Sequence, residues 1–437
     1  MISLFSLLAI VFSLFGSYCN PYWNSISFKS NEDWNSKPYD YILTYEQAKG
    51  DLDYAMKYLK KIHPKLYGAI PEEIQNRYDA AVLNLQNAEE ITTNTVAQEV
   101  QGIFSMLGDA HTHIELNYPD QRYMKYISSH NDAGDVLKGI NGQTWEQLLE
   151  AYSDRISYEV KDYGMESISQ YVNSIENLAY LGISVENGIV YNYETENGEK
   201  IEQYVEESDF LSYDEYIKFS QAEAGGTEEN ATEESSFVYY EINQENSAAV
   251  LTLYSCNYNS EYKSTVKNMF KEIKEKGIKN VAVDLRNNGG GNSLVANEFF
   301  RYIDIDSYKE WACDWRLGYF MLHFPQTTVQ NDRYEDLLFQ GNLYVLTSGY
   351  TFSSAMNFAE YVKDNHFGTI IGEPSGNAPD SYGDISYFKL PNSGIVIRPS
   401  TKKWYRIDNK EGLIEPDIAC DEWEAVDWFY RECQEKF

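Results

Sequence analysis

The sequence predicts an α/β protein with a mainly parallel sheet in its second half, preceded by a helical region and a mixed middle region. Two observations support this prediction. Between residues 44 and 108, apolar residues recur at helical spacing. From Ser236 onward, short apolar runs such as VAVDL alternate with helical patterns, an order typical of parallel strands joined by crossover helices.

Three helices are expected in the first region. Thr44 and Gln47 match a capping box at the start of the first helix. Thr95 and Gln98 match the same pattern at the start of the third helix. We therefore expect an N-terminal helical domain at residues 20–118.

The middle region, residues 119–236, combines strands and helices. GDVLKGINGQTWEQLLE predicts a strand, a turn at Asn141-Gly142 and a helix, and NGIVYNYETENGEKIEQYVE predicts a hairpin. AEAGGTEENATEESS, at the end of the region, is acidic and without periodicity, so we expect an exposed linker there.

The charge balance and the N-terminus limit the function and the location. The chain has 35 basic and 68 acidic residues and a formal net charge of -33, which argues against nucleic-acid binding. Residues 1–19 are mainly apolar and end in small residues, a pattern typical of a secretory signal peptide cleaved before Asn20. A membrane anchor is the alternative, although the run is short for a span. We expect a secreted or extracytoplasmic protein with no stable membrane insertion after signal removal.

Four cysteines would remain after cleavage: Cys256, Cys313, Cys420 and Cys433. An even number in an exported chain permits two disulfides, with three possible connectivities that the sequence does not distinguish. Buried free thiols are the alternative. No cysteine pair has the spacing of metal ligands.

Three stretches carry residues suited to serine-nucleophile chemistry. GYTFSSAMNFA places Ser353 and Ser354 between an expected strand and an expected helix, VDLRNNGGGNS contains Gly289–Gly291, and LGDAHTHIEL contains His111 and His113. A serine nucleophile needs a base and oxyanion donors. His111 offers the base, and backbone N–H groups of the glycines and of Ser354 offer the donors. Each stretch also has a structural interpretation: a helix cap, a flexible turn, or a histidine pair that caps a helix or binds a metal.

Six segments, taken in order, resemble successive landmarks of the tail-specific (C-terminal processing) protease family, which includes the tricorn protease core. They are IHPKLYG, GDAHTHI, VAVDLRNNGGG, TSGYTFSSAMNFA, GTIIGEPSG and GLIEPDI. The resemblance extends from about residue 44 to the C-terminus. It implies a crotonase-like catalytic core at residues 237–437, with Ser353 as the nucleophile, Gly290 and Ser354 as oxyanion donors, and a peptide or protein as the substrate.

The family uses two kinds of general base, and the sequence fits one of them better. Asn377 stands where one branch has a lysine, so the resemblance favours the tricorn-like branch and implies His111 as the base. Its acidic partner would be Glu411 or Asp408. Many members also carry a PDZ module before the core, and GDVLKGINGQTWEQLLE resembles the end of one; a degenerate PDZ-like module in the middle region is therefore one interpretation.

The expected function is that of an exported serine endopeptidase that hydrolyses peptide bonds through an acyl-enzyme on Ser353 and needs no cofactor or metal. The alternative is an inactive relative that binds a peptide or a lipid. This alternative rests on two departures from the family pattern: Ala110 replaces a serine of the tricorn-like branch, and Met356 replaces an acidic residue common in relatives. The sequence does not indicate the oligomeric state.

Overall fold

The computed structural model describes residues 20–27, 29, 33–124, 131, 133–195, 197–223 and 236–435. The expected signal peptide and most of the expected acidic linker lie outside the described residues. The chain divides into two units, and each is described by itself. Unit 1 takes the described residues of Met1–Glu229, Asp314–Leu322 and Tyr382–Lys403, and unit 2 takes those of Asn230–Cys313, His323–Ser381 and Trp404–Phe437. The expected helical and middle regions thus share one unit, which two segments of the expected core complete.

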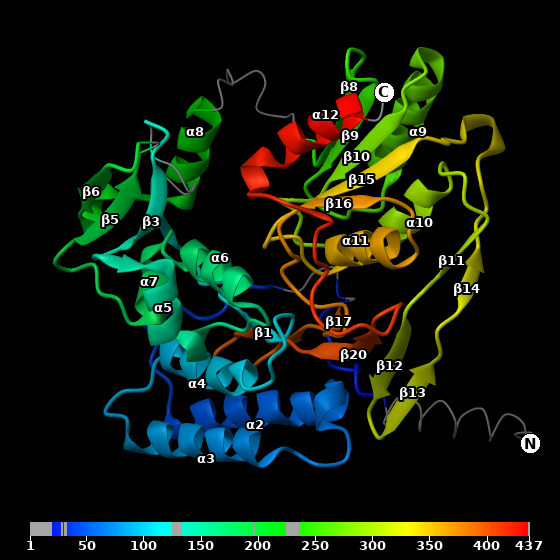
Figure 1. Ribbon diagram of the computed structural model, residues 1–437. Helices are drawn as coiled ribbons and strands as arrows, with labels where there is room; N and C mark the ends of the chain where they lie inside the picture. Colours follow the sequence, from blue (N-terminus) through cyan, green and yellow to red (C-terminus); the bar gives the residue numbers. More distant parts are fainter. Residues whose placement is uncertain are drawn as a thin grey trace, which may run out of the picture. The chain divides into compact units, whose positions relative to one another are not determined.

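Unit 1 begins with the three helices that the sequence predicts, shown in blue in Figure 1: α2 (Tyr45–Ile62), α3 (Glu72–Asn87) and α4 (Thr93–Ser105). Thr44 and Gln47 form the expected capping box. The start of α4 differs from the prediction, because Thr92 caps it and Thr95 completes the capping box. Gln98 has another role, since its side-chain amide donates to the carbonyl of Tyr180 at 2.8 Å.

The middle region adds strands and helices to unit 1. The predicted turn is present, with positive φ at Asn141 and Gly142, and the predicted hairpin forms between β5 and β6. The sheet order is β4-β3-β5-β6, and β2 pairs with β7. The elements are β2 (Arg122–Met124), β3 (Val136–Ile140), β4 (Gln143–Thr144), α5 (Trp145–Ala151), α6 (Lys161–Tyr171), α7 (Ile175–Leu181), β5 (Ile189–Glu194), β6 (Lys200–Val205), β7 (Phe210–Ser212) and α8 (Tyr213–Glu223).

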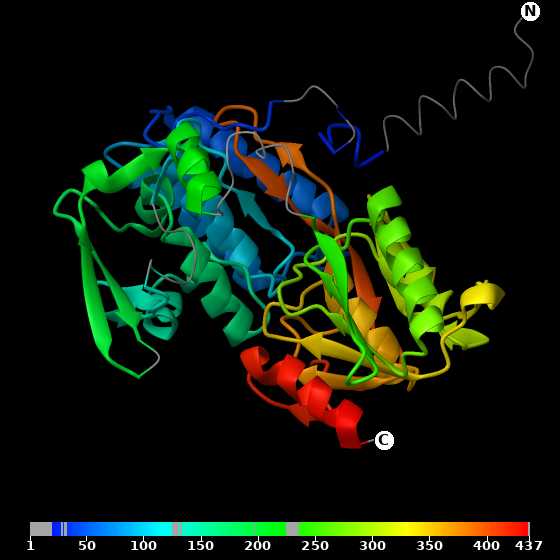
Figure 2. The same cartoon turned by 90° about the horizontal axis from the view of Figure 1, so that it is seen from above.

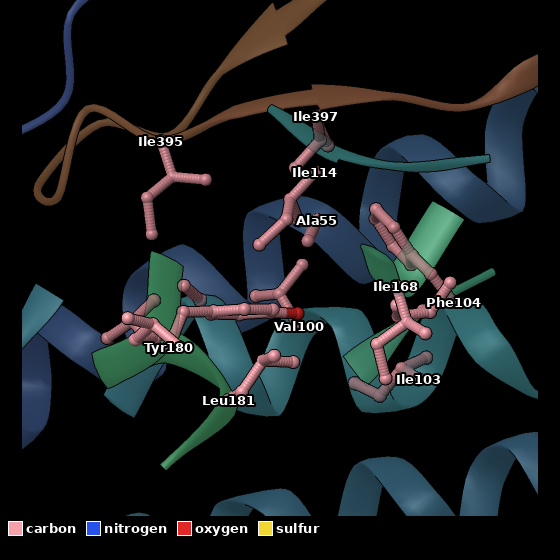
Figure 3. Close-up of a cluster of buried hydrophobic side chains, with 14 of the residues drawn as sticks. Ala55, Val100, Ile103, Phe104, Ile114, Ile168, Tyr180, Leu181, Ile395 and Ile397 are labelled. Atoms are coloured by element: carbon pink, nitrogen blue, oxygen red, sulfur yellow. The ribbon is translucent and has the colours of Figure 1, made fainter. Parts of the chain in front are cut away.

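The core of unit 1 joins residues that are far apart in the sequence. Figure 3 shows Val100 and Phe104 of α4 packed with Tyr180 of α7 and with Ile395 and Ile397, all buried. The late residues reach this core because β1 (His113–Glu115) pairs with β19 (Val396–Arg398), which also pairs with β18 (Phe388–Lys389). A further sheet has the order β13-β12-β20-β17 and consists of β12 (Ala312–Leu317), β13 (Phe320–Phe324), β17 (Tyr382–Ile385) and β20 (Ser400–Tyr405).

Unit 2 is built on a six-stranded sheet in the order β21-β16-β15-β10-β9-β8. Its neighbouring strands are parallel except for β8 and β9, which are antiparallel. The mainly parallel sheet expected for the second half of the chain is therefore observed. The elements of unit 2 are β8 (Val238–Asn243), β9 (Ala248–Leu253), α9 (Ser260–Lys276), β10 (Asn280–Asp284), α10 (Leu294–Phe300), β11 (Ser307–Lys309), β14 (Thr328–Gln330), β15 (Asn342–Thr347), α11 (Ser354–Asp364), β16 (Thr369–Gly372), β21 (Ile418–Ala419) and α12 (Ala425–Glu435).

Helices cover both faces of this sheet, as the apolar runs of its strands require. Alternate residues of β10 point to opposite faces: Val281 and Val283 belong to the core that includes α9, α10 and α11, whereas Ala282 packs in the core of α12 with Phe429. Figures 1 and 2 show α12, in red, beside the strands. The sheet is thus buried on both faces, which leaves the carboxyl ends of its strands as the place for a site.

None of the four cysteines among the described residues forms a disulfide, and Cys256, Cys313 and Cys433 are buried. The two disulfides that an even count permits are therefore not formed in this structure. Among the described residues, no helix combines the length and the apolar character needed to cross a bilayer.

Candidate active site

Ser353 occupies a strained turn between β15 and α11. Its φ of 56° and ψ of -123° lie where a residue with a side chain is rarely found, a kind of strain that clusters at functional sites. The Ser353 N–H donates to Oδ1 of Asn377 at 2.8 Å, and the Ser353 carbonyl accepts from the Asn357 N–H at 2.8 Å. Within the described part of unit 2, no hydrogen bond ties down the Ser353 hydroxyl. The backbone N–H and carbonyl of Ser353 are therefore both held, whereas its hydroxyl is not.

The predicted glycine run lies directly against this serine. Gly290 has a φ of 103°, and a Cβ atom placed on it would lie 2.6 Å from Cβ of Ser353 and 2.9 Å from the carbonyl oxygen of Phe352. Atoms do not approach so closely, so only glycine fits here. The structure therefore brings together two of the predicted site residues from the ends of two neighbouring strands, β10 and β15.

Asn288 fixes the position of the glycine run. Its side chain is fully buried and donates through Nδ2 to the carbonyl of Leu253 at 2.8 Å. Its Oδ1 accepts the Gly290 N–H at 2.8 Å, and its backbone carbonyl accepts the Phe352 N–H at 3.1 Å. The N–H expected to serve as an oxyanion donor is thus engaged by Asn288 in this conformation, and the clearest contribution of Gly290 is the space left by its missing side chain.

Ser354 begins α11, and its side chain is not positioned as a nucleophile. The hydroxyl donates to the carbonyl of Gly291 at 2.9 Å and lies 3.0 Å from the hydroxyl of Ser293. The side chain of Ser354 therefore braces the glycine run. The N–H of Ser354 is at the first position of the helix. N–H groups there have no intrahelical acceptor and form the positive end of the helix dipole.

Asn377, at the position where the resemblance puts a lysine in one branch, holds the backbone of Ser353. Its side chain is fully buried. Besides accepting the Ser353 N–H, it donates through Nδ2 to the carbonyl of Ala378 at 3.1 Å and to the Ser381 hydroxyl at 3.2 Å. An amide supplies the acceptor that the strained turn needs and cannot act as a base at neutral pH.

His111 belongs to unit 1, in the turn between α4 and β1, and is buried. Its N–H donates to Oδ1 of Asp109 at 2.9 Å, and its carbonyl accepts from Nε of Arg398 at 3.2 Å. Its ring Nδ1 lies 3.8 Å from the same carboxylate oxygen. His113 starts β1, and its Nδ1 donates to the carbonyl of Ile114 at 2.8 Å.

Asp109 is a buried carboxylate beside His111 that the sequence analysis did not select. Its Oδ2 accepts from Nε2 of His63 at 2.9 Å and from the Thr112 hydroxyl at 2.5 Å. His63 is oriented in turn, because its Nδ1 accepts the Lys65 N–H at 3.2 Å. His63 lies in the landmark segment IHPKLYG and Asp109 in the landmark segment GDAHTHI. The sequence motifs therefore contained both residues, although they indicated no function for either.

The surroundings of these groups fix their charges. Burial alone would raise the pKa of Asp109, but His63, His111 and Thr112 hold it well below its usual range, so this carboxyl is ionised. Burial lowers the pKa of His111 to about 4; Asp109 opposes this shift and Arg398 adds to it. Above that pH the imidazole is neutral, as a general base must be.

The two residues predicted as acidic partners of His111 lie in unit 2. Glu411 is exposed. Asp408 forms ion pairs with Nε of Arg406 at 3.0 Å and with Nζ of Lys410 at 2.6 Å. Burial opposes ionisation of Asp408, but Lys410 and Arg406 keep its pKa below the ordinary value.

Among the described residues, one group could hold a metal ion: Asp109, His111 and Glu159, whose ligand atoms lie within 4.8 Å of one another. The hydrogen bonds from His63 and Thr112 already use the lone pairs of one Asp109 oxygen.

Comparisons with known proteins agree with this chemistry. Residues 247–420, which contain Ser353, Gly290 and Asn377, match the model of peptidase family S41. A search of curated proteins found no match.

Among solved structures, mature CPAF superimposes with a TM-score of 0.62 at 12% identity over 90% of this chain and 96% of that chain. CPAF complexed with lactacystin gives a TM-score of 0.61 at 12% identity over 90% and 97%. A photosystem II D1 C-terminal processing protease gives 0.49 at 11% identity over 88% and 96%. The two CPAF structures show a shared fold.

Proposed function

We propose that the protein is a serine endopeptidase with Ser353 as the nucleophile and His111 as the general base. The observation that carries the proposal is the strained Ser353 turn, pressed against Gly290 at the start of α11. Strain of this kind has a cost, and it is explained if it presents the hydroxyl to a substrate. The match of residues 247–420 to the model of peptidase family S41 supports the same chemistry.

In the proposed reaction, Oγ of Ser353 attacks the scissile carbonyl while His111 accepts the hydroxyl proton. Collapse of the tetrahedral intermediate breaks the C–N bond, and the imidazolium gives its proton to the leaving amine. A water molecule then attacks the acyl-enzyme and passes a proton to His111. Collapse of the second tetrahedral intermediate breaks the bond between the acyl carbon and Oγ, and the imidazolium returns the proton to Oγ, which releases the acid and restores Ser353. No redox step or cofactor is required.

For the developing oxyanion, we propose the Ser354 N–H as the first donor, because it lies at a helix N-terminus beside the nucleophile. Gly290 remains the proposed second donor. Its N–H would have to be shared between the oxyanion and Oδ1 of Asn288, which accepts it in this structure.

For the acidic partner of His111, we propose Asp109. Its oxygen lies 3.8 Å from Nδ1, and the carboxylate is buried and ionised, so it would stabilise the imidazolium that forms when the base takes a proton. Glu411 and Asp408, which the family resemblance implies, remain the alternatives. The Arg406 and Lys410 ion pairs make Asp408 the weaker of the two.

We also propose that the substrate is a peptide or protein, that unit 2 is the crotonase-like core of the enzyme, and that the chain is exported. The resemblance of its landmarks to the tail-specific proteases supports the first two statements, and the apolar residues 1–19 support the third.

The proposal is tested by labelling the purified protein with a fluorophosphonate probe and locating the modified residue by mass spectrometry. We expect labelling of Ser353 in the wild-type protein and in Ser354→Ala, and none in Ser353→Ala. Labelling of another serine would move the nucleophile. A folded protein that no fluorophosphonate labels would favour the inactive, ligand-binding relative.

A further inference from the structure

Unit 1 contains two adjoining clefts of opposite character, and neither is lined by a residue placed in the proposed catalytic machinery. The first has a volume of about 940 Å³, and its lining includes Tyr22, Trp315, Leu317, Phe320 and Ile385. Aromatic and aliphatic side chains dominate it. A cleft of this size and lining is typical of a site for a small apolar ligand.

The second cleft has a volume of about 830 Å³ and is lined by four cations: Lys57, Lys60, Lys61 and Arg316. Pro21 and Tyr319 line both clefts, which therefore adjoin each other. In a chain with 35 basic and 68 acidic residues, four cations around one cleft form a local reversal of the net charge.

The charge of the second cleft is not neutralised by the protein. Among the described residues, none of the four cations forms an ion pair. The cleft also contains Asp53, but that carboxylate is paired with Nζ of Lys49 at 2.8 Å and accepts a hydrogen bond from the Tyr78 hydroxyl. The cationic cleft is therefore ready for an anion.

Arg316 gives the second, independent sign of a missing anion. Its side chain is buried, with the residue 6% exposed. Nε and Nη2 donate to the carbonyls of Lys61 and Lys60 at 3.3 and 3.1 Å, at the carboxyl end of α2. Nη1 is buried with no acceptor among the described residues. The guanidinium also lies over the ring of Tyr67, 4.5 Å from its centroid, but no carboxylate in the described part of the chain neutralises it. Because buried cations are ordinarily paired with a carboxylate, Arg316 leaves a positive charge that an anionic ligand could offset.

The apolar cleft also has a feature that is typical of a ligand-binding site, two exposed aromatic side chains at its rim. Tyr319 and Phe320, at the turn between β12 and β13, are 86% and 62% exposed. Large aromatic side chains exposed together at the rim of an apolar cleft mark a ligand-binding surface.

We propose that the two clefts form one binding site for an anionic amphiphile with a single hydrocarbon chain, such as a long-chain carboxylate. The hydrocarbon chain occupies the apolar cleft, and the anionic head lies at Lys57, Lys60 and Lys61, in the field of Arg316. A net charge of -33 opposes adsorption of the whole protein to an anionic bilayer, whereas a cleft with local positive charge accepts a single molecule. The proposal does not depend on the peptidase chemistry of Ser353.

The test is a titration of the full chain, in detergent-free buffer, with oleate displacing a fluorescent long-chain carboxylate. Three further titrants identify the chemistry: oleyl alcohol, a peptide with apolar residues and an acidic terminus, and vesicles of phosphatidylcholine with phosphatidylglycerol. We expect saturable binding of oleate, binding about tenfold or more weaker for oleyl alcohol, and no preference for the peptide or the vesicles.

Variants locate the site. Lys57→Gln, Lys60→Gln and Lys61→Gln combined should weaken oleate binding by about tenfold or more and change oleyl alcohol binding little, whereas Phe320→Ser should weaken both ligands. The matched control replaces three exposed lysines of unit 2, Lys267, Lys271 and Lys279, by glutamine and should leave binding unchanged. Since all these positions are at the surface, circular dichroism should show a folded protein in each case.

Four outcomes would overturn the proposal: no saturable oleate binding, equal weakening in the control triple variant, tighter binding of the peptide, or binding to vesicles alone. Repeating the titration with the Ser353→Ala chain separates this site from the proposed active site, because oleate binding should persist there.

Discussion

The turn that carries Ser353 and the turn that carries His111 are held in place by different forces. Around the serine, neutral groups act: the amides of Asn377 and Asn288 hold backbone N–H groups, and Gly290 leaves room for the nucleophile. Around the histidine, a buried charge acts, because Asp109 binds the backbone of His111 and the ring of His63.

Because of this difference, the two turns should respond to different changes in the protein and in its surroundings. The serine turn depends on shape and on uncharged hydrogen bonds, so it should tolerate changes of pH and respond to changes of side-chain volume. The histidine turn depends on an ionised carboxyl in a buried place, so it should respond to charge and to pH. The predictions below test this difference between the serine turn and the histidine turn.

The largest effect is expected on the serine side. Ser353→Ala removes the attacking oxygen and should lower kcat by roughly a thousandfold or more, as for other serine nucleophiles. Ser354→Ala keeps the backbone N–H and should cost far less. Turnover of a peptide library by both purified variants, with mass-spectrometric detection, measures this. An inactive Ser354→Ala beside an active Ser353→Ala would place the nucleophile one residue later.

The next effect is expected at Asp109. Asp109→Asn removes the negative charge beside His111 while keeping the shape, and should lower kcat by about 10²–10³ with little change in KM. Asp408→Asn and Glu411→Gln are the matched controls, and steady-state kinetics with thermal melting compares all three. If Glu411→Gln loses more activity than Asp109→Asn, then Glu411 is the acidic partner.

A smaller loss is expected when the neutral support of the serine is removed. Asn377→Ala leaves the Ser353 N–H without its acceptor and should lower kcat by roughly ten- to a hundredfold, because a buried unsatisfied donor costs about 1–3 kcal/mol. Asn331→Ala is the control, since Asn331 is likewise an asparagine of unit 2 whose side chain holds backbone groups, the carbonyls of Phe300 and Ile305. Equal losses of stability with unequal losses of kcat would show positioning, whereas equal losses of both would contradict it.

The pH profile sharpens the contrast on the histidine side. With a pKa of about 4 instead of 6.5, His111 is neutral over most of the range, so acylation should rise with pH through a limb centred near pH 4. The same depressed pKa means that the unfolded chain binds a proton that the folded chain does not. The free energy of unfolding should therefore fall as pH drops from about 6.5 to about 4.

Single-turnover acylation and urea unfolding across this range measure both effects. His111→Ala should lose the limb together with most of the activity, and His113→Ala should keep it. A limb near or above neutral pH in the wild-type protein would contradict a buried histidine base and point to a different group.

The smallest effect is expected from chelation. Because serine and histidine supply the proposed chemistry, EDTA should change kcat by less than about twofold. A loss of activity that added zinc restores would instead assign a metal to Asp109, His111 and Glu159.

The sequence predicted the serine side better than the histidine side, for a physical reason. A serine between a strand and a helix and a glycine run after the neighbouring strand are local patterns, and the carboxyl ends of parallel strands meet at one edge. Periodicity also predicted the three helices and the hairpin. The start of α4 was displaced because two threonines three residues apart, Thr92 and Thr95, formed the capping box in place of Thr95 and Gln98.

The roles of Asp109, His63, Asn288 and Asn377 could not be predicted, because each depends on a partner defined only in the folded chain. Asp109 is 46 residues from His63 in the sequence, and Asn377 is 24 residues from Ser353. An aspartate or an asparagine in a loop has many uses, and burial decides among them. The segments that make up unit 1 could not be predicted for the same reason. Nothing in the sequence pattern of residues 382–403 indicates that they belong to the same unit as the helices near residue 45.

Because unit 1 needs residues 382–403 as well as the helices near residue 45, the order of synthesis affects how the protein folds. The helices α2 to α4 leave the ribosome long before the strand that pairs with β1 and before Ile395 and Ile397, which complete the same core. Until then the apolar faces of these helices have no complete core, a state in which chains aggregate. A newly made chain should therefore need a chaperone, or should delay the folding of unit 1, until residues 395–398 have emerged.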